Sequence, residues 1–321
     1  MALILREADV RQLLTMPDAI DALDVAFRDW GVGAAQNVSR QRIVLPQQQG
    51  VLHMLAAAVP ALDMLGFKAY TASPHGVRFV VNLYRASTGE LLAMIEADWL
   101  GRMRTGAASG LATRVLARAD AQTVGMIGTG GQAETQLRAM SAARSLTSAR
   151  VWGRDRARLE AFCAQMTQQL HLSVTPAATA AAAIHEAAIV VTATTSHDPV
   201  LEGAWVAAGA HVNAMGSNWA NRREIDDATV QRADLIVADS VAQAQIEAGD
   251  LIIPATAGKL DWGRVQELHA VIAGNTPGRT NDQQITLFKS LGIGLEDIAV
   301  AARIYTLARE RGVGEELAFL P

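Results

Sequence analysis

Cysteine is almost absent from this chain of 321 residues, and its seven histidines are dispersed. A single thiol, Cys163, can form no disulfide within the chain and supplies too few ligands for a cysteine-based zinc cluster. The histidines show neither His-x₃-His nor His-Glu-x-x-His spacing. We therefore expect no metal site and no disulfide framework.

Long apolar runs and a strong excess of either charge are also missing. No uninterrupted hydrophobic stretch approaches the ~20 residues that span a bilayer. The net charge is −4, so the chain has no bulk electrostatic attraction to nucleic acid or to an anionic membrane. The first residues lack the basic and apolar regions of an export signal. We expect a cytoplasmic protein with a small-molecule substrate and neither a nucleic-acid nor a membrane partner.

Two different patterns of apolar and turn-forming residues predict an α/β protein of two domains. Residues 40–85 contain short apolar stretches separated by Pro, Gly, Gln and Ser, which is typical of antiparallel strands. Strand-like and helix-like segments then alternate within 119–294, which predicts a Rossmann-type, doubly wound parallel sheet. We expect residues 1–118 to form an N-terminal α+β domain, with an amphipathic helix in 295–321 packing back on it.

The sharpest motif is a glycine-rich loop between a predicted strand and a predicted helix. Its sequence is Gly128-Thr129-Gly130-Gly131-Gln132-Ala133, which matches G-x-G-x-x-A. The first glycine permits a tight turn, the second lets backbone approach a pyrophosphate, and the small last residue lets helix and strand pack closely. We predict that residues 128–132 bind a dinucleotide at the helix N-terminus.

The residues after two other predicted strands bear on the choice of cofactor. An NAD-specific unit places an acid on the ribose at the end of its second strand, but here that position is Gly153, followed by Arg154. Glycine leaves room for a 2′-phosphate that arginine can bind, which favours NADPH, while Asp155 keeps NAD open as the alternative. Thr192 and Thr194 end a further sheet strand, where cofactors lie, and we expect both to contact the cofactor.

The order of several further segments along the chain indicates a family resemblance. They are Gly66-Phe67-Lys68, Arg104-Thr105-Gly106, the glycine-rich loop, Gly216-Ser217-Asn218, and Phe288-Lys289-Ser290-Leu291-Gly292 ahead of Leu295-Glu296-Asp297. In this order they resemble the ornithine cyclodeaminase/mu-crystallin family, from about Arg42 to Ala308. The resemblance implies a Rossmann domain, an N-terminal domain for substrate binding and homodimerisation, and Ser290 near the nicotinamide.

The resemblance also implies which residues hold the substrate. Arg42, with Arg40 as a nearby competitor, Lys68 and Arg104 match the family's groups for a substrate carboxylate. Arginine binds a carboxylate bidentately, and a lysine ammonium can polarise an imine or give it a proton. His53 falls in the same block and is either a structural residue or a second proton donor.

One position departs from the family's cyclodeaminases. They carry an aspartate where this chain has Asn218, and an amide neither takes a proton at neutral pH nor pairs with an ammonium. A reductase that starts from an imine needs no such acid. We therefore predict an NAD(P)H-dependent reductase of a small cyclic imino acid such as Δ1-pyrroline-2-carboxylate. An NAD-dependent ornithine cyclodeaminase and a non-catalytic protein that retains NADPH are the alternatives.

Overall fold

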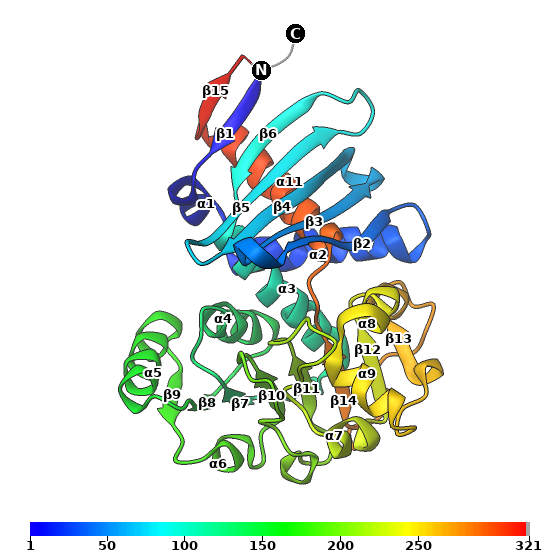
Figure 1. The fold of residues 1–321 in the computed structure, drawn as a ribbon. Coiled ribbons are helices and arrows are strands. Elements are labelled where there is room, and N and C mark those ends of the chain that lie inside the picture. Colours follow the sequence, from blue (N-terminus) through cyan, green and yellow to red (C-terminus); the bar gives the residue numbers. More distant parts are fainter. Residues whose placement is uncertain (319–321) are drawn as a thin grey trace. The chain divides into compact units, whose positions relative to one another are not determined.

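The structure is a computed structural model that describes residues 1–318. The chain divides into two compact units, each built around one sheet (Figure 1). The first unit contains Met1–Arg104 together with the chain from Gly292 onward, and the second contains Thr105–Leu291. The first boundary falls inside helix α3 (Asp98–Leu116), so this helix contributes residues to both units.

The first unit contains a seven-stranded mixed sheet. Its strands are β1 (Ala2–Leu5), β2 (Gln36–Leu45), β3 (Gly50–Val59), β4 (Met64–Ser73), β5 (Gly76–Arg85), β6 (Leu91–Glu96) and β15 (Glu315–Leu317). Their order is β15-β1-β6-β5-β4-β3-β2. Strands β2 to β6 pair antiparallel in succession, as the sequence predicts, whereas β1 runs parallel to β6 and antiparallel to β15.

Three helices belong to this unit, namely α1 (Glu7–Leu13), α2 (Met16–Gly31) and α11 (Gly294–Arg311). Helix α11 packs on β3 and β4 and against α2, as expected for the C-terminal amphipathic segment. Helix α11 lies close to the backbone of β4 at Gly66, where a Cβ would lie 3.0 Å from the Ile298 side chain. The same Cβ would lie 2.2 Å from the Asn82 carbonyl oxygen on the neighbouring strand β5. Since side chains alternate along a strand, β4 turns Gly66 and Lys68 toward α11 and turns Leu65 and Phe67 away from it.

The second unit contains an eight-stranded parallel sheet. Its strands are β7 (Thr123–Ile127), β8 (Ser148–Trp152), β9 (Ser173–Pro176), β10 (Ile189–Thr192), β11 (His211–Ala214), β12 (Leu235–Ala238), β13 (Val265–Glu267) and β14 (Thr286–Lys289). Their order is β13-β12-β14-β11-β10-β7-β8-β9, and every neighbouring pair is parallel. The predicted doubly wound sheet is confirmed.

The direction in which successive strands are added to this sheet reverses between β7 and β10. The two strands are neighbours, yet β8 and β9 separate them in sequence and lie on the far side of β7. The helices of the unit are α4 (Ala133–Ala143), α5 (Arg156–Leu170), α6 (Ala180–Ile184), α7 (Asp227–Arg232), α8 (Val241–Glu247), α9 (Gly249–Thr256) and α10 (Leu268–Ile272). Ligands of open α/β sheets bind at the carboxyl ends of strands at such a reversal, which directs attention to the ends of β7, β8 and β10.

Two kinds of feature are absent from residues 1–318. No helix there is long and apolar enough to cross a membrane, and no group of three or more His, Cys, Asp or Glu side chains could hold a metal ion. Cys163 is buried in α5, and burial raises the pKa of its thiol to about 11. The thiol is therefore protonated at neutral pH.

Candidate active site

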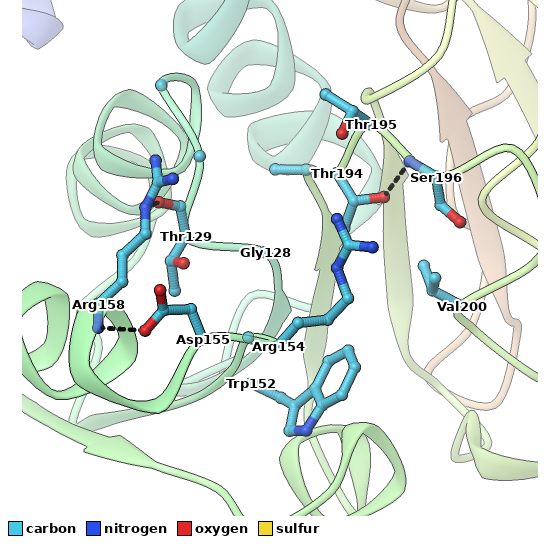
Figure 2. A pocket seen from close by; sticks show the side chains of 14 residues that line it. Gly128, Thr129, Trp152, Arg154, Asp155, Arg158, Thr194, Thr195, Ser196 and Val200 are labelled. Carbon is cyan, nitrogen blue, oxygen red and sulfur yellow. Dashed lines mark hydrogen bonds between the residues drawn. The ribbon is translucent and has the colours of Figure 1, made fainter.

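A cavity of about 370 Å³ lies at the carboxyl ends of β7, β8 and β10, within the second unit (Figure 2). Its lining consists of Gly128, Thr129, Gly130, Gly131, Trp152, Gly153, Arg154, Asp155, Arg158, Ala193, Thr194, Thr195, Ser196 and Val200. The structure thus brings most of the predicted cofactor residues to one cavity. Of the others, Gln132 is the N-cap residue of α4, while Thr192 and Ser290 are not part of the lining.

The glycine-rich loop forms a cradle that a dinucleotide pyrophosphate fits. Gly128 has φ +119°, and a Cβ there would lie 2.3 Å from the Ala193 carbonyl oxygen, so the position requires glycine. A Cβ at Gly130 would meet only one atom, at 3.8 Å, which leaves the backbone open to the cavity. Helix α4 begins directly afterwards, so its free N–H groups face the same loop.

The residues that follow β8 bring both arginine and acid to the cavity, because Arg154, Asp155 and Arg158 all line it. The Asp155 carboxylate accepts a hydrogen bond from the Arg158 backbone at 3.0 Å and so caps helix α5. The Arg158 Nε donates to the Thr129 carbonyl at 2.9 Å. Figure 2 shows Arg154 extending from the end of β8 toward the loop of Thr194. At Gly153, a Cβ would lie 3.1 Å from the Thr129 side chain, so a larger residue would crowd this corner.

A buried carboxylate that the sequence analysis missed ties the loops after β10 and β11 together. Glu224 is fully buried and accepts hydrogen bonds from the Thr192 hydroxyl at 2.8 Å and from the backbones of Thr194 and Gly216, each at 2.6 Å. Burial, followed by the charge of Asp250, raises the pKa of Glu224. The Thr192 hydroxyl thus holds Glu224, whereas Thr194 lines the cavity.

A second buried pair fixes the segment that carries Asn218. The Lys289 Nζ donates to the Ser217 carbonyl at 2.6 Å and lies 2.8 Å from Asp250, and the side chains of both charged residues are fully buried. Asn218 itself is half-buried in the loop that follows β11. Ser290 is 2% exposed, and its hydroxyl has no hydrogen-bond partner in the part of the chain that the structure describes.

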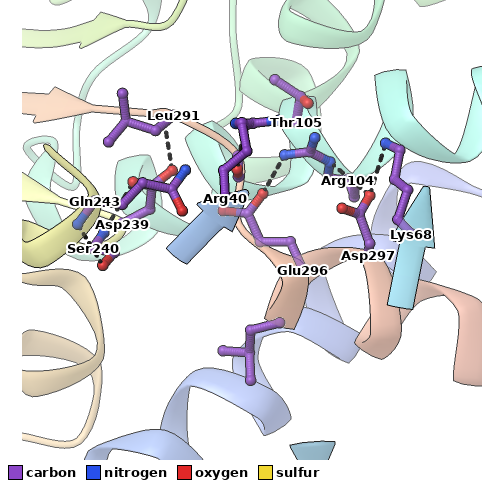
Figure 3. Close-up of polar contacts among 12 residues, drawn as sticks. Arg40, Lys68, Arg104, Thr105, Asp239, Ser240, Gln243, Leu291, Glu296 and Asp297 are labelled. Atoms are coloured by element: carbon purple, nitrogen blue, oxygen red, sulfur yellow. Dashed lines mark hydrogen bonds and ion pairs between the residues drawn. The ribbon is translucent and has the colours of Figure 1, made fainter. Parts of the chain in front are cut away.

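The first unit contains a buried charged cluster made of Lys68, Arg104, Glu296 and Asp297 (Figure 3). The Asp297 Oδ1 lies 3.0 Å from the Lys68 Nζ and 3.1 Å from the Arg104 Nε. The Glu296 Oε2 lies 2.7 Å from the Arg104 Nη1. The four side chains are at most 8% exposed. Both acids stand in the first turn of α11, where the helix dipole favours negative charge.

The two cations of the charged cluster respond differently to burial. Burial lowers the pKa of Lys68 to about 8, and Arg104 and Arg40 act in the same direction, while Asp297 opposes them. Burial also acts against the charge of Arg104, but Asp297 and Glu296 outweigh it and raise the pKa of Arg104. Arg104 is therefore a fixed cation, and Lys68 can change its protonation state near neutral pH.

Two arginines on β2, Arg40 and Arg42, lie near His53, and Arg40 also lies near Lys68. Arg40 is 7% exposed and donates to the Tyr70 hydroxyl and to the Gly292 carbonyl, both at 2.8 Å. Arg42 is half-buried and is the cross-strand partner of His53. The sequence left open which arginine belongs to the site, and the structure brings both close enough to affect the pKa of His53.

His53 stacks on Tyr70, with ring centroids 4.2 Å apart and planes 5° from parallel. Burial and then the charges of Arg40 and Arg42 lower the pKa of His53 to about 4. The imidazole is therefore neutral at pH 7 and has no proton to give as an acid. This favours the structural reading of His53 over that of a second proton donor.

The chain is similar to known proteins over nearly its whole length. The family model described as ornithine cyclodeaminase/mu-crystallin family matches residues 1–312. A Δ1-pyrroline-2-carboxylate reductase of Bacillus cereus is 32% identical over 325 residues, which covers 99% of this chain and all of that protein.

Two similar solved structures cover nearly the whole chain. The Δ1-pyrroline-2-carboxylate reductase of Thermococcus litoralis, in complex with NADH and L-proline, has a TM-score of 0.93 at 33% identity, covering 98% of this chain and 100% of that one. An archaeal alanine dehydrogenase dimer with bound NAD has a TM-score of 0.92 at 29% identity and covers 99% of both chains.

Proposed function

The chain belongs to the ornithine cyclodeaminase/mu-crystallin family, and we propose that it reduces a small cyclic imino acid with NAD(P)H. The observation that carries the proposal is the buried Lys68 beside Arg104, a proton donor next to a fixed cation. The relatives named Δ1-pyrroline-2-carboxylate reductase support this substrate class. In this proposal residues 1–118 and 295–321 bind the substrate, and residues 119–294 bind the cofactor.

The proposed chemistry converts the C=N bond of a ketimine acid into CH–NH. The dinucleotide, when bound, supplies the hydride that the imine carbon receives. Arg42 and Arg104 bind the substrate carboxylate, and Lys68 gives its proton to the ring nitrogen. With a pKa of about 8, Lys68 is mostly protonated at pH 7 yet acidic enough to act as a donor. Asn218 cannot take a proton from an amine, which disfavours deamination of ornithine.

We propose NADPH as the preferred cofactor. Arg154 and Arg158 line the cavity beside Gly153, and a 2′-phosphate would find two guanidinium groups there. The one acid at this corner, Asp155, is engaged as the cap of α5. NAD remains the alternative, since the similar structures carry NADH or NAD.

We also propose a homodimer that forms through the outer face of the first unit's sheet. Helix α11 covers one face, while apolar side chains of β2 and β4 are exposed on the other face. By strand register, those on this outer face are Val38, Ile43, Leu45, Leu65 and Phe67. Exposed apolar side chains gathered on one face are typical of interaction sites. The similar alanine dehydrogenase is described as a dimer.

The decisive assay is oxidation of NADPH with Δ1-pyrroline-2-carboxylate and with its six-membered homologue. We expect turnover with at least one imine and none with ornithine plus NAD, followed through ammonia release. Ammonia from ornithine would instead establish a cyclodeaminase and show that another group replaces the acid missing at Asn218. Tight binding of NADPH without turnover of any imine would favour a binding protein.

A further inference from the structure

Asp297 is the link of the charged cluster in the first unit. It is fully buried, and its Oδ1 contacts the Lys68 ammonium at 3.0 Å and the Arg104 guanidinium at 3.1 Å. Lys68 reaches this point from β4 and Arg104 from α3, so the carboxylate on α11 joins side chains of two other elements. The Asp297 Oδ2 is buried without a hydrogen-bond partner among residues 1–318.

We propose that Asp297 is a positioning residue for the imine reduction: its Oδ1 holds Lys68 and Arg104 side by side and keeps Lys68 charged inside the cluster. The catalytic consequence rests on the proposed function, whereas the effect of Asp297 on Lys68 does not. Asp297 acts through Lys68, and no contact with substrate is assigned to it. This role goes beyond the carboxylate binding and proton donation ascribed to Lys68 and Arg104.

The surroundings of Lys68 show why one carboxylate matters. The Lys68 Nζ lies 5.1 Å from the Phe79 ring centroid, and a Cβ at Gly101 would lie 2.9 Å from the Nζ, so the ammonium is closely packed and has little room for water. The charged and titratable groups around it are Asp297 and Glu296 on α11, Arg104 on α3, Arg40 on β2, His53 on β3 and Tyr70 on β4.

Within this set Asp297 is the carboxylate that contacts Lys68. Burial, Arg104 and Arg40 all favour the neutral amine, while Asp297 favours the ammonium through both its charge and its hydrogen bond. Loss of the Asp297 charge would leave Lys68 beside two guanidinium groups with no opposite charge in contact. An amine in that setting is neutral at pH 7 and has no proton to give.

The composition of the chain makes a direct measurement practical. Only three lysines are present, Lys68, Lys259 and Lys289. Labelling the full-length protein with ¹³C-lysine therefore gives three side-chain Cε signals, assigned with Lys259→Arg and Lys68→Arg. Their chemical shifts, followed against pH without substrate or cofactor, report the titration of Lys68.

We expect the Lys68 signal of the wild-type protein to titrate near pH 8. In Asp297→Asn the midpoint falls by about one pH unit or more, because an opposite charge at this distance shifts a pKa by that amount. Glu296→Gln is the matched control: it removes the neighbouring carboxylate, which contacts Arg104, and moves the Lys68 midpoint much less. An unchanged midpoint in a folded Asp297→Asn protein overturns the proposal.

A second variant covers the case in which Asp297→Asn does not fold. Arg104→Gln removes a like charge and leaves the Asp297 Oδ1 to Lys68 alone, so the Lys68 midpoint must rise. A midpoint that stays or falls in this variant contradicts the shared-carboxylate arrangement.

Kinetics separate this proposal from the proposed function. If the wild-type protein reduces imines, the alkaline limb of its kcat/KM profile moves to lower pH in Asp297→Asn by the same interval as the Lys68 signal. If the wild-type protein is active and Asp297→Asn has the same kcat/KM profile against pH, the positioning role of Asp297 is contradicted. The proposed function is then unaffected. An inactive wild type contradicts the proposed function and leaves the lysine titration as an independent result.

Discussion

The three lysines of the chain have three different environments, and these decide what each can do. Lys68 is buried in the charged cluster, Lys289 is buried against Asp250, and Lys259 is half exposed beside Asp227. Burial lowers the pKa of Lys68 to about 8. It is therefore the lysine suited to proton transfer near neutral pH.

Replacing Lys68 tests this assignment. In Lys68→Ala we expect kcat for imine reduction to fall by about 10²–10⁴, the usual contribution of a positioned proton donor. Affinity for NADPH, measured by quenching of protein fluorescence, should stay near the wild-type value. Lys259→Ala, a half-exposed lysine outside both sites, is the control and should retain full turnover. Undiminished kcat in Lys68→Ala would remove Lys68 from the mechanism.

Arg154 provides the corresponding test of cofactor choice. In Arg154→Ser we expect KM for NADPH to rise at least about tenfold, because a charge-assisted bond to phosphate is lost, while KM for NADH changes little. Arg156→Ser is the control, since Arg156 is exposed on α5, pairs with Glu160 and does not line the cavity. A parallel change for both cofactors would show that Arg154 does not distinguish them.

Local motifs in the sequence led to several residues that the structure brings to one cavity. The glycine-rich loop, Arg154 and Thr194 all line the cavity, since strand, loop and helix lie close together in sequence. The acids were missed as partners because their contacts depend on the tertiary fold. Lys68 meets Asp297 across 229 positions, and Glu224 meets Thr192 across 32. The motif Leu295-Glu296-Asp297 was visible, but nothing local indicated which cations it contacts.

Among the elements, the long periodic segments and most strands of the parallel sheet were predicted, whereas β1 and β15 were not. Strand β1 has four residues and β15 has three, too few to show alternation. They pair with each other and β1 also pairs with β6, so their structure arises from contacts between distant parts of the chain. Helix α11 begins at Gly294, one residue before the predicted segment, because apolar residues recur at helical spacing from there, and it ends at Arg311.

The strand–loop–helix element β7–α4 depends on Gly128. In Gly128→Ala the methyl group would lie 2.3 Å from the Ala193 carbonyl oxygen at a φ of +119°. We expect a loss of roughly 1–3 kcal/mol in unfolding free energy, measured by denaturant titration, together with weaker NADPH binding. Gly33→Ala is the control, because it has φ +80° with no atom within 4 Å of the new methyl. Cofactor affinity should change only in Gly128→Ala.

At the scale of the whole molecule, the exposed apolar face of the first sheet predicts self-association. Leu65→Glu places a charge on the face that β4 turns away from α11, and we expect it to shift the protein from dimer toward monomer in light scattering after size-exclusion chromatography. Val32→Glu changes an exposed valine at the end of α2 and should leave the mass unchanged. A wild-type monomer would contradict the proposed dimer, and a dimer that Leu65→Glu leaves intact would place the interface elsewhere.

The proposed reaction transfers hydride from a reduced nicotinamide to the imine carbon of a cyclic imino acid. To test it, the protein is supplied with Δ1-pyrroline-2-carboxylate and with NADPH deuterated at the transferring position of nicotinamide C4, and the product is analysed by mass spectrometry. We expect proline carrying one deuterium at Cα. Proline without that deuterium, or no proline at all with either NADPH or NADH, would contradict it.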